Sequence, residues 1–135
     1  MIENVWCILC KEIIQDSRTK LISYMNCFEE LATRKLPGIA PTFSIGTFWR
    51  KTSDSQEILS VKIRLVEPSG NEKVLLDSGP IEMNKKSHNL NLSIEGMSIA
   101  HEGVYRFIIE FFNEERWILV KELKFNVKLI VNGGR

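Results

Sequence analysis

The stretch 90–127, LNLSIEGMSIAHEGVYRFIIEFFNEERWILVKELKFNV, decides the predicted fold. Apolar residues alternate with polar ones from 90 to 94, and apolar residues occupy every second position from Tyr105 to Phe111. Successive side chains of a strand point to opposite faces, so this period of two predicts half-buried strands. A third apolar run follows the polar turn at 113–116. Two such runs joined by a four-residue polar loop predict a β-hairpin over 104–127.

Shorter apolar runs separated by turn residues precede this hairpin. Residues 5–14 and 21–28 predict an N-terminal hairpin, and further strands are predicted at 42–51, 59–66, 72–78 and 81–83. Gly46 lies inside one of these runs and indicates either a bulge or the close approach of another segment. Pro37 and Pro41 limit the segment 29–36 to at most one short helical turn.

Eight or nine short strands without a long helix predict an all-β fold. The expected architecture is an antiparallel two-sheet β-sandwich of the immunoglobulin or fibronectin-III type. The chain has 135 residues and 44% apolar content, enough for one two-layer core. We therefore predict a single domain over residues 1–130 and a frayed C-terminal tail over 131–135.

The charge balance argues against nucleic acid and membrane as partners. Eighteen basic and 17 acidic residues leave a formal net charge of +1, whereas anionic partners usually select a strongly basic surface. Glu3 stands where a signal peptide carries positive charge, and no apolar run approaches the roughly 20 residues of a membrane helix. A cytoplasmic location is expected, and three cysteines fit a reducing compartment better than a disulfide framework.

The segment before the predicted hairpin has the order of a tyrosine corner. An alternating strand, a polar loop at 95–102, Gly103-x-Tyr105 and a second alternating strand follow one another. In such a corner the tyrosine hydroxyl bonds back to the backbone of the preceding loop, which gives Gly103 and Tyr105 a structural role. At this point the chain resembles immunoglobulin-like sandwiches, although it lacks their Cys…Trp…Cys arrangement.

A set of motifs in fixed order resembles a family of small bacterial proteins of unknown function. The motifs are Cys27-Phe28-Glu29 at the end of the second strand, the loop Leu36-Pro37-Gly38, Arg-Leu-Val-x-Pro-x-Gly at 64–70 and Gly-x-Tyr-x-Phe at 103–107. The resemblance covers residues 3–128. It implies a sandwich domain and brings no catalytic residues with it.

The candidate metal ligands and catalytic groups are few. Cys7 and Cys10 form a CxxC, and a third cysteine and two histidines invite a zinc hypothesis. On a strand, residues three apart point to opposite faces, so we predict no metal site. His101 beside Glu102 is the best titratable pair, but no nucleophile elbow or glycine-rich oxyanion loop accompanies it. We predict no cofactor and no enzymatic activity, and a hydrolase around His101 is the least favoured alternative.

Several apolar residues fall on positions that parity assigns to the outer faces of the sheets. Four lie on the predicted hairpin: Ile108, Phe112, Ile118 and Val120. Paired across the hairpin they would form one apolar outer face, and such faces mark association surfaces. The alternative is that the N-terminal hairpin or the segment 29–41 covers them within one chain. Parity leaves the placement of Trp6, Trp49 and Trp117 open.

These observations favour a non-catalytic interaction or assembly domain. Its expected partner is an unidentified protein or a second copy of the chain, in which case a homodimer forms. A small-ligand or carbohydrate-binding sandwich is the alternative function. In that case the flat ring of Trp49 or Trp117 would stack on a sugar face.

Overall fold

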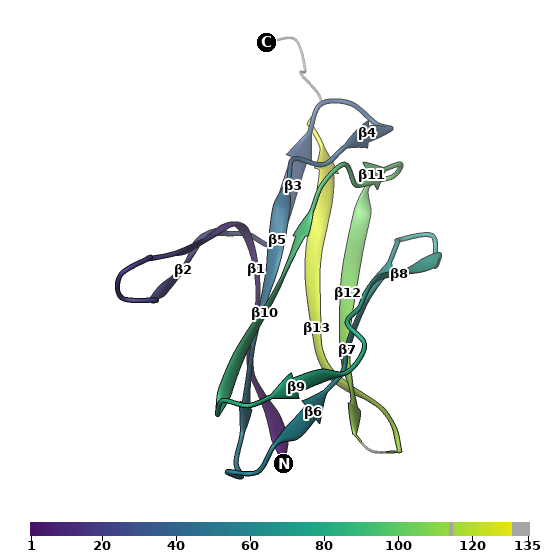
Figure 1. The fold of residues 1–135 in the computed structure, drawn as a ribbon. Coiled ribbons are helices and arrows are strands. Elements are labelled where there is room, and N and C mark those ends of the chain that lie inside the picture. Colours follow the sequence, from purple (N-terminus) through teal and green to yellow (C-terminus); the bar gives the residue numbers. More distant parts are fainter. Residues whose placement is uncertain (114, 131–135) are drawn as a thin grey trace.

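The computed structural model describes residues 1–113 and 115–130, and within them the chain is all-β, as predicted. Two larger sheets, of four and five strands, are joined by two short ribbons of two strands each (Figure 1). The described residues contain no helix with the length and apolar character needed to span a bilayer. The predicted tail at 131–135 lies outside the described residues.

The four-stranded sheet has the order β10-β5-β1-β2 and is antiparallel throughout. Its strands are β10 (Ser87–Ile94), β5 (Phe43–Lys51), β1 (Ile2–Gln15) and β2 (Ile22–Cys27). Residues 2–10 of β1 pair with β5. Beyond Cys10, which pairs with both neighbours, β1 pairs only with β2. The β1–β2 hairpin, residues 10–27, therefore projects from the body of the sheet (Figure 1).

The five-stranded sheet has the order β3-β13-β12-β7-β8. Its strands are β3 (Glu30–Thr33), β13 (Arg116–Leu129), β12 (Gly103–Asn113), β7 (Val61–Val66) and β8 (Glu72–Asp77). The predicted hairpin forms the centre of this sheet as β12 and β13. The two strands pair from Gly103 opposite Val127 to Asn113 opposite Arg116.

The region 29–36 stays within the predicted limit of at most one short helical turn, but it overturns the expectation that both sheets are antiparallel. This region contains no helical turn; it forms β3, which pairs in parallel with β13, so the five-stranded sheet is mixed and not antiparallel. The edge of β13 that faces away from β12 carries backbone N–H groups. Backbone carbonyls at both ends of the β3 region accept hydrogen bonds from this edge. Asn126 N–H donates to the Glu29 carbonyl at 2.8 Å, and Ile130 N–H donates to the Thr33 carbonyl at 2.7 Å.

The strand count was also underestimated, since thirteen strands occur in the described residues where eight or nine were expected. The excess comes mainly from very short strands. Two ribbons pair β4 (Gly38–Ile39) with β11 (Ser98–Ile99) and β6 (Glu57–Leu59) with β9 (Ile81–Met83). Segments of two or three residues are too short to show a period, so of these four strands only the one at 81–83 was predicted.

One hydrophobic cluster lies between the two larger sheets. The four-stranded sheet contributes Leu9, Phe43, Ile45 and Trp49, and the five-stranded sheet contributes Ile63, Leu65, Tyr105, Phe107, Ile109, Phe125 and Val127. The rings of Phe43 and Phe107, from opposite sheets, have centroids 5.8 Å apart. Side chains from both sheets thus pack against one another with ring spacings typical of aromatic pairs.

Candidate functional site

The corner residues have the structural role that the sequence predicted. Tyr105 is buried, and its hydroxyl donates a hydrogen bond of 2.8 Å to the backbone carbonyl of His101. Burial raises the pKa of this hydroxyl. Gly103 has φ +129°, and a Cβ added there would lie 3.0 Å from the Pro68 Cβ. Only glycine fits this position, because both the backbone conformation and the space exclude a side chain.

The titratable pair in the corner loop is part of the same structure. The carboxylate of Glu102 accepts a hydrogen bond of 2.7 Å from the backbone N–H of Leu129, which ties the loop to β13. The backbone carbonyl of His101 receives the Tyr105 hydroxyl. The Glu102 side chain and the His101 backbone therefore take part in fixing the crossover between the sheets.

Cys7 and Cys10 lie on opposite sides of β1, as strand geometry requires. Cys7 belongs to the core cluster, and its thiol donates to the Asn4 Oδ1 at 3.4 Å. Burial raises the pKa of Cys7 to about 11. Cys10 is fully buried but is not part of that cluster. Across residues 1–113 and 115–130, no three His, Cys, Asp or Glu side chains gather closely enough to hold a metal ion.

The structure places each of the three tryptophans differently. Trp49 is fully buried, and its Nε1–H donates to the Thr47 hydroxyl at 2.8 Å, so it offers no face to a sugar. Trp6 stacks on Phe48 on the outer side of the four-stranded sheet, with ring centroids 4.5 Å apart. Trp117 is half-buried near the tip of the β12–β13 hairpin. Of the two tryptophans that the carbohydrate-binding alternative proposed for stacking on a sugar, Trp49 is therefore excluded.

The predicted outer face of the β12–β13 hairpin needs a correction. A β-bulge between Ile109 and Glu110 shifts the pairing by one residue, so that Phe111 lies opposite Ile118 and Phe112 opposite Trp117. Phe111 and Val120 pack against the core, and Ile118 shares their side of the sheet. Ile118 and Val120 therefore do not join Ile108 and Phe112 on the outer face.

Trp117 and Leu119 take the outer positions instead. We call Phe112, Trp117 and Leu119 the apolar strip. The rings of Phe112 and Trp117 meet edge to face with centroids 5.5 Å apart, and the Lys62 Nζ lies 4.2 Å from the Trp117 ring centroid. Leu119 is 58% exposed and Phe112 is 39% exposed, whereas Ile108 is almost completely buried at 8%.

Ion pairs cover the neighbouring part of this outer face. Arg64 Nε contacts a Glu110 carboxylate oxygen at 2.9 Å, and the same guanidinium pairs with Glu72. The Glu122 Oε1 forms ion pairs with the Arg106 Nη1 at 3.8 Å and with the Lys124 Nζ at 3.7 Å. The apolar strip is thus bordered by side chains of both charges.

The other outer face, on the four-stranded sheet, is partly covered by the β1–β2 hairpin. Ile13 and Tyr24 lie directly over Gly46, where any added Cβ would collide with the tyrosine ring. The Tyr24 hydroxyl also accepts a hydrogen bond of 3.0 Å from the Trp6 Nε1–H. This confirms the close approach of another segment that Gly46 indicated in the sequence.

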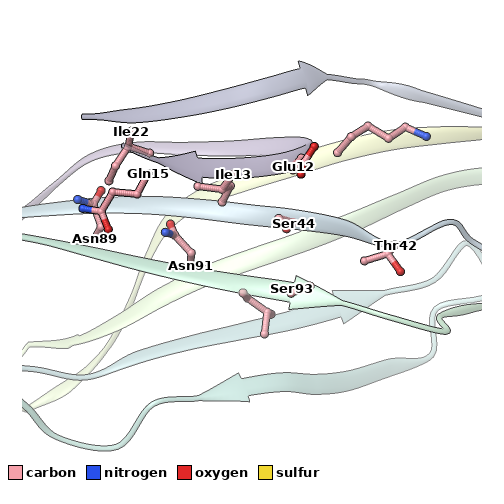
Figure 2. Close-up of a pocket in the computed structure, with 11 residues that line it drawn as sticks. Glu12, Ile13, Gln15, Ile22, Thr42, Ser44, Asn89, Asn91 and Ser93 are labelled. Atoms are coloured by element: carbon pink, nitrogen blue, oxygen red, sulfur yellow. The ribbon is translucent and has the colours of Figure 1, made fainter. Parts of the chain in front are cut away.

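A polar groove of about 640 Å³ remains between this hairpin and the sheet. Figure 2 shows Asn89 and Asn91 on β10 turned toward the hairpin, with Gln15 and Ile13 on the facing strand. Ser44, Ser93 and Thr42 add hydroxyl groups to the lining. The sequence signal for this groove was the alternation of polar residues at 89, 91 and 93, from which no site was predicted.

The fold is similar to parts of larger proteins of known structure. Pseudomonas fluorescens alkylpurine DNA glycosylase AlkC, bound to DNA containing an abasic site analog, matches with a TM-score of 0.59 at 7% identity. This match covers 94% of the chain and 30% of the glycosylase chain. A β-glucosidase from Listeria innocua in complex with glucose matches with a TM-score of 0.56 at 7% identity, over 97% of the chain and 16% of that enzyme.

The chain therefore spans less than a third of either protein, and at this identity the likeness shows the fold alone. No curated protein sequence matches the chain. The model of a protein family described as a family of unknown function, DUF6941, matches residues 5–128.

Proposed function

The chain belongs to DUF6941, a family of unknown function, and from this premise we propose that it is a non-catalytic domain that binds another protein through the apolar strip. The observation that carries the proposal is the exposure of Phe112 and Leu119 beside Trp117, on a sheet face whose neighbouring part carries ion pairs. The fold that presents the strip is proposed to be a variant of the immunoglobulin-like sandwich.

The composition of this surface supports association with protein. Interfaces concentrate aromatic residues at their centre and place charged and polar groups at their rim. Here two aromatic rings and a leucine form the centre, and Lys62, Arg64 and Glu110 border it. Since both charge signs occur in the border, a second copy of the chain is compatible with the surface, as is a different protein. A two-fold dimer requires such a self-complementary patch.

A charge introduced into the strip tests the proposal. We expect Leu119→Lys to weaken association by about 30-fold or more, because interface hot spots contribute at least about 2 kcal/mol each. Sedimentation equilibrium and light scattering measure self-association, and co-purification measures other partners. Ile39→Lys is the matched control, because Ile39 is a 71% exposed aliphatic residue on the short strand β4.

The outcome against the proposal is specific. A wild-type protein that stays monomeric, and that co-purifies with the same proteins as Leu119→Lys, would show that the strip recruits nothing. Loss of association in Ile39→Lys to the same extent would show that the measurement responds to added charge and not to this surface.

A second function is favoured by the groove beneath the β1–β2 hairpin. The amides of Asn89, Asn91 and Gln15 offer donors and acceptors without net charge, which suits a neutral polyhydroxylated ligand such as a saccharide. Calorimetry and tryptophan fluorescence against a glycan panel test this function, with Asn91→Ala expected to lose binding. Asn71→Ala in the exposed turn before β8 is the control. Equal binding by both variants, or no binding by the wild type, contradicts it.

Catalysis is not part of the proposal. The Glu102 carboxylate makes a structural hydrogen bond in the corner, as does the His101 backbone carbonyl, and burial raises the pKa of the Cys7 thiol. We further propose a cytoplasmic location. Hydrolase activity that is present in the wild type and absent in His101→Ala would contradict the non-catalytic assignment.

A further inference from the structure

Cys10 and Cys27 lie directly opposite each other at the base of the β1–β2 hairpin, although 16 residues separate them in the sequence. Both are free thiols. The other neighbour of Cys10 across the sheet is Ser44, which lines the groove beneath the hairpin. The thiol pair is thus placed where the hairpin leaves the four-stranded sheet.

The hydrogen bonding around the pair defines its geometry. The Phe28 N–H donates to the Leu9 carbonyl at 3.2 Å, so this bond joins the residue after Cys27 to the residue before Cys10. This pattern belongs to a non-hydrogen-bonded pair of an antiparallel ladder, whose Cα atoms lie about 4.5 Å apart with their side chains close together. A disulfide requires Cα atoms about 4.4–6.8 Å apart, a range that includes the spacing of such a pair in a regular ladder. Beside the pair, Asn26 departs from the regular ladder with φ +56°.

The two thiols differ in access to solvent. Cys27 is exposed, whereas Cys10 is fully buried. Burial, and to a lesser extent the neighbouring Cys27, raises the pKa of the Cys10 thiol. An oxidant from solution therefore reaches Cys27 first, and Cys10 is placed to resolve the product.

We propose that Cys10 and Cys27 form a redox-active dithiol site that takes a low-molecular-weight disulfide, such as glutathione disulfide, as its oxidant. The Cys27 thiol gives its proton to solvent and attacks one sulfur of glutathione disulfide, whose S–S bond breaks and releases one glutathione thiolate, which takes up a proton. Cys10 then gives its proton to solvent and attacks the Cys27 sulfur, and the second glutathione thiolate leaves. Two protein thiols are oxidised by two electrons, and one glutathione disulfide is reduced to two glutathione molecules.

The disulfide would fasten the base of the hairpin that covers Gly46. The hairpin contributes Ile13 and Gln15 to the groove, so oxidation would hold this side of the groove in place. The dithiol site depends on the pairing of β1 with β2 and not on the apolar strip. It can therefore be tested whether or not the apolar strip binds a partner.

The experiment equilibrates the whole protein with glutathione disulfide at neutral pH and maps the product by mass spectrometry without reduction. We expect the monomer to lose two hydrogen atoms and the peptide containing Cys10 to be linked to the peptide containing Cys27. Trypsin leaves Cys7 and Cys10 in one peptide, residues 1–11. The mapping is therefore repeated in Cys7→Ser, which keeps a donor for Asn4 and should keep the link.

Two further variants define the outcome. Cys27→Ser changes an exposed residue and should remove the loss of two hydrogen atoms, and Cys10→Ser should retain one glutathione on Cys27. Hydrogen exchange in β2 should slow after oxidation of the wild type. A stable glutathione adduct on wild-type Cys27, an intermolecular Cys27 disulfide as the sole product, or loss of the link in Cys7→Ser would overturn the proposal.

Discussion

The outer faces of the two larger sheets both carry aromatic residues, but the chain folds back over only one of these faces. On the four-stranded sheet, Trp6 stacks on Phe48 and donates a hydrogen bond to Tyr24 of the β1–β2 hairpin. On the five-stranded sheet, Phe112 and Leu119 stay exposed beside Trp117. The difference teaches that an outward apolar residue marks an association surface only where the chain itself does not fold back over it.

The largest expected effect comes from forcing the hairpin off the four-stranded sheet. Gly46→Val should destabilise the protein by about 1–3 kcal/mol, because its side chain would occupy the space of the Tyr24 ring and the Ile13 side chain. Urea denaturation measures the free energy of unfolding. In a Tyr24→Ala background the same substitution should cost much less, and an equal cost in both backgrounds would show that the hairpin does not cover this face.

A pair of matched substitutions compares the two faces directly, since Trp6 and Phe112 are each 39% exposed. Trp6→Ala should cost about 2 kcal/mol, because it removes a stacked ring pair and a hydrogen bond to the hairpin. Phe112→Ala should cost about half as much and should reduce association instead. Thermal unfolding and sedimentation measure the two effects, and equal losses of stability would erase the distinction between the faces.

A pH titration probes the inner side of the four-stranded sheet, where Cys7 is buried. Its pKa rises from 9.0 to about 11 on folding, so the unfolded chain loses this proton first. The stability due to the neutral thiol is fully present below pH 9 and is lost as the pH rises toward 11. Since one pKa unit corresponds to about 1.36 kcal/mol, the loss should reach at most about 2.7 kcal/mol. Tyr105, whose pKa burial also raises, adds a loss of the same sign.

The Cys7→Ser variant is the control for this titration. It should show a smaller decrease of the unfolding free energy between pH 9 and pH 11 than the wild type, because serine does not ionise in this range. An unchanged pH dependence would assign the decrease to Tyr105 or Cys10 and would contradict the buried position of Cys7.

The smallest effect concerns the ion pairs that border the apolar strip. Glu110→Gln should lower the free energy of unfolding by about 0.5–1 kcal/mol at low salt, since Glu110 is partly buried against Arg64. The loss should shrink as salt screens the pair. Asp54→Asn, in a pair with Lys86 whose side chains are 92% and 64% exposed, is the control and should change nothing measurable. If Asp54→Asn lowered the free energy of unfolding as much as Glu110→Gln, the ion pair beside the apolar strip would be no more stabilising than a fully exposed pair.

The local features of the fold could be predicted from the sequence. The alternation at 105–111 and the polar turn at 113–116 led to the central hairpin, and Gly103-x-Tyr105 led to the corner hydrogen bond. These features depend on residues close in sequence, whose side-chain directions follow from strand geometry. Gly46 likewise indicated a close approach, although the sequence could not identify Tyr24 as the residue that makes it.

The candidate site was only partly predictable, and a single bulge is the main reason. One extra residue at the Ile109/Glu110 step moved Ile118 and Val120 to the inner side and Trp117 and Leu119 to the outer side. Nothing in the alternation of β13 reports a bulge, because it arises from the pairing of two strands. The parallel strand β3 was missed for the same reason, since four residues show too short a pattern without their partner.

What the sequence by itself determined is the all-β character, the central hairpin and the tyrosine corner, because side-chain parity and turn chemistry are properties of neighbouring residues. Only the tertiary structure decided which outer face is covered, which residues form the apolar strip and that Cys10 meets Cys27. These outcomes depend on strand register and on the docking of a hairpin, which bring together residues far apart in the chain. A shift of one residue in such a pairing reverses the faces while leaving every local pattern unchanged.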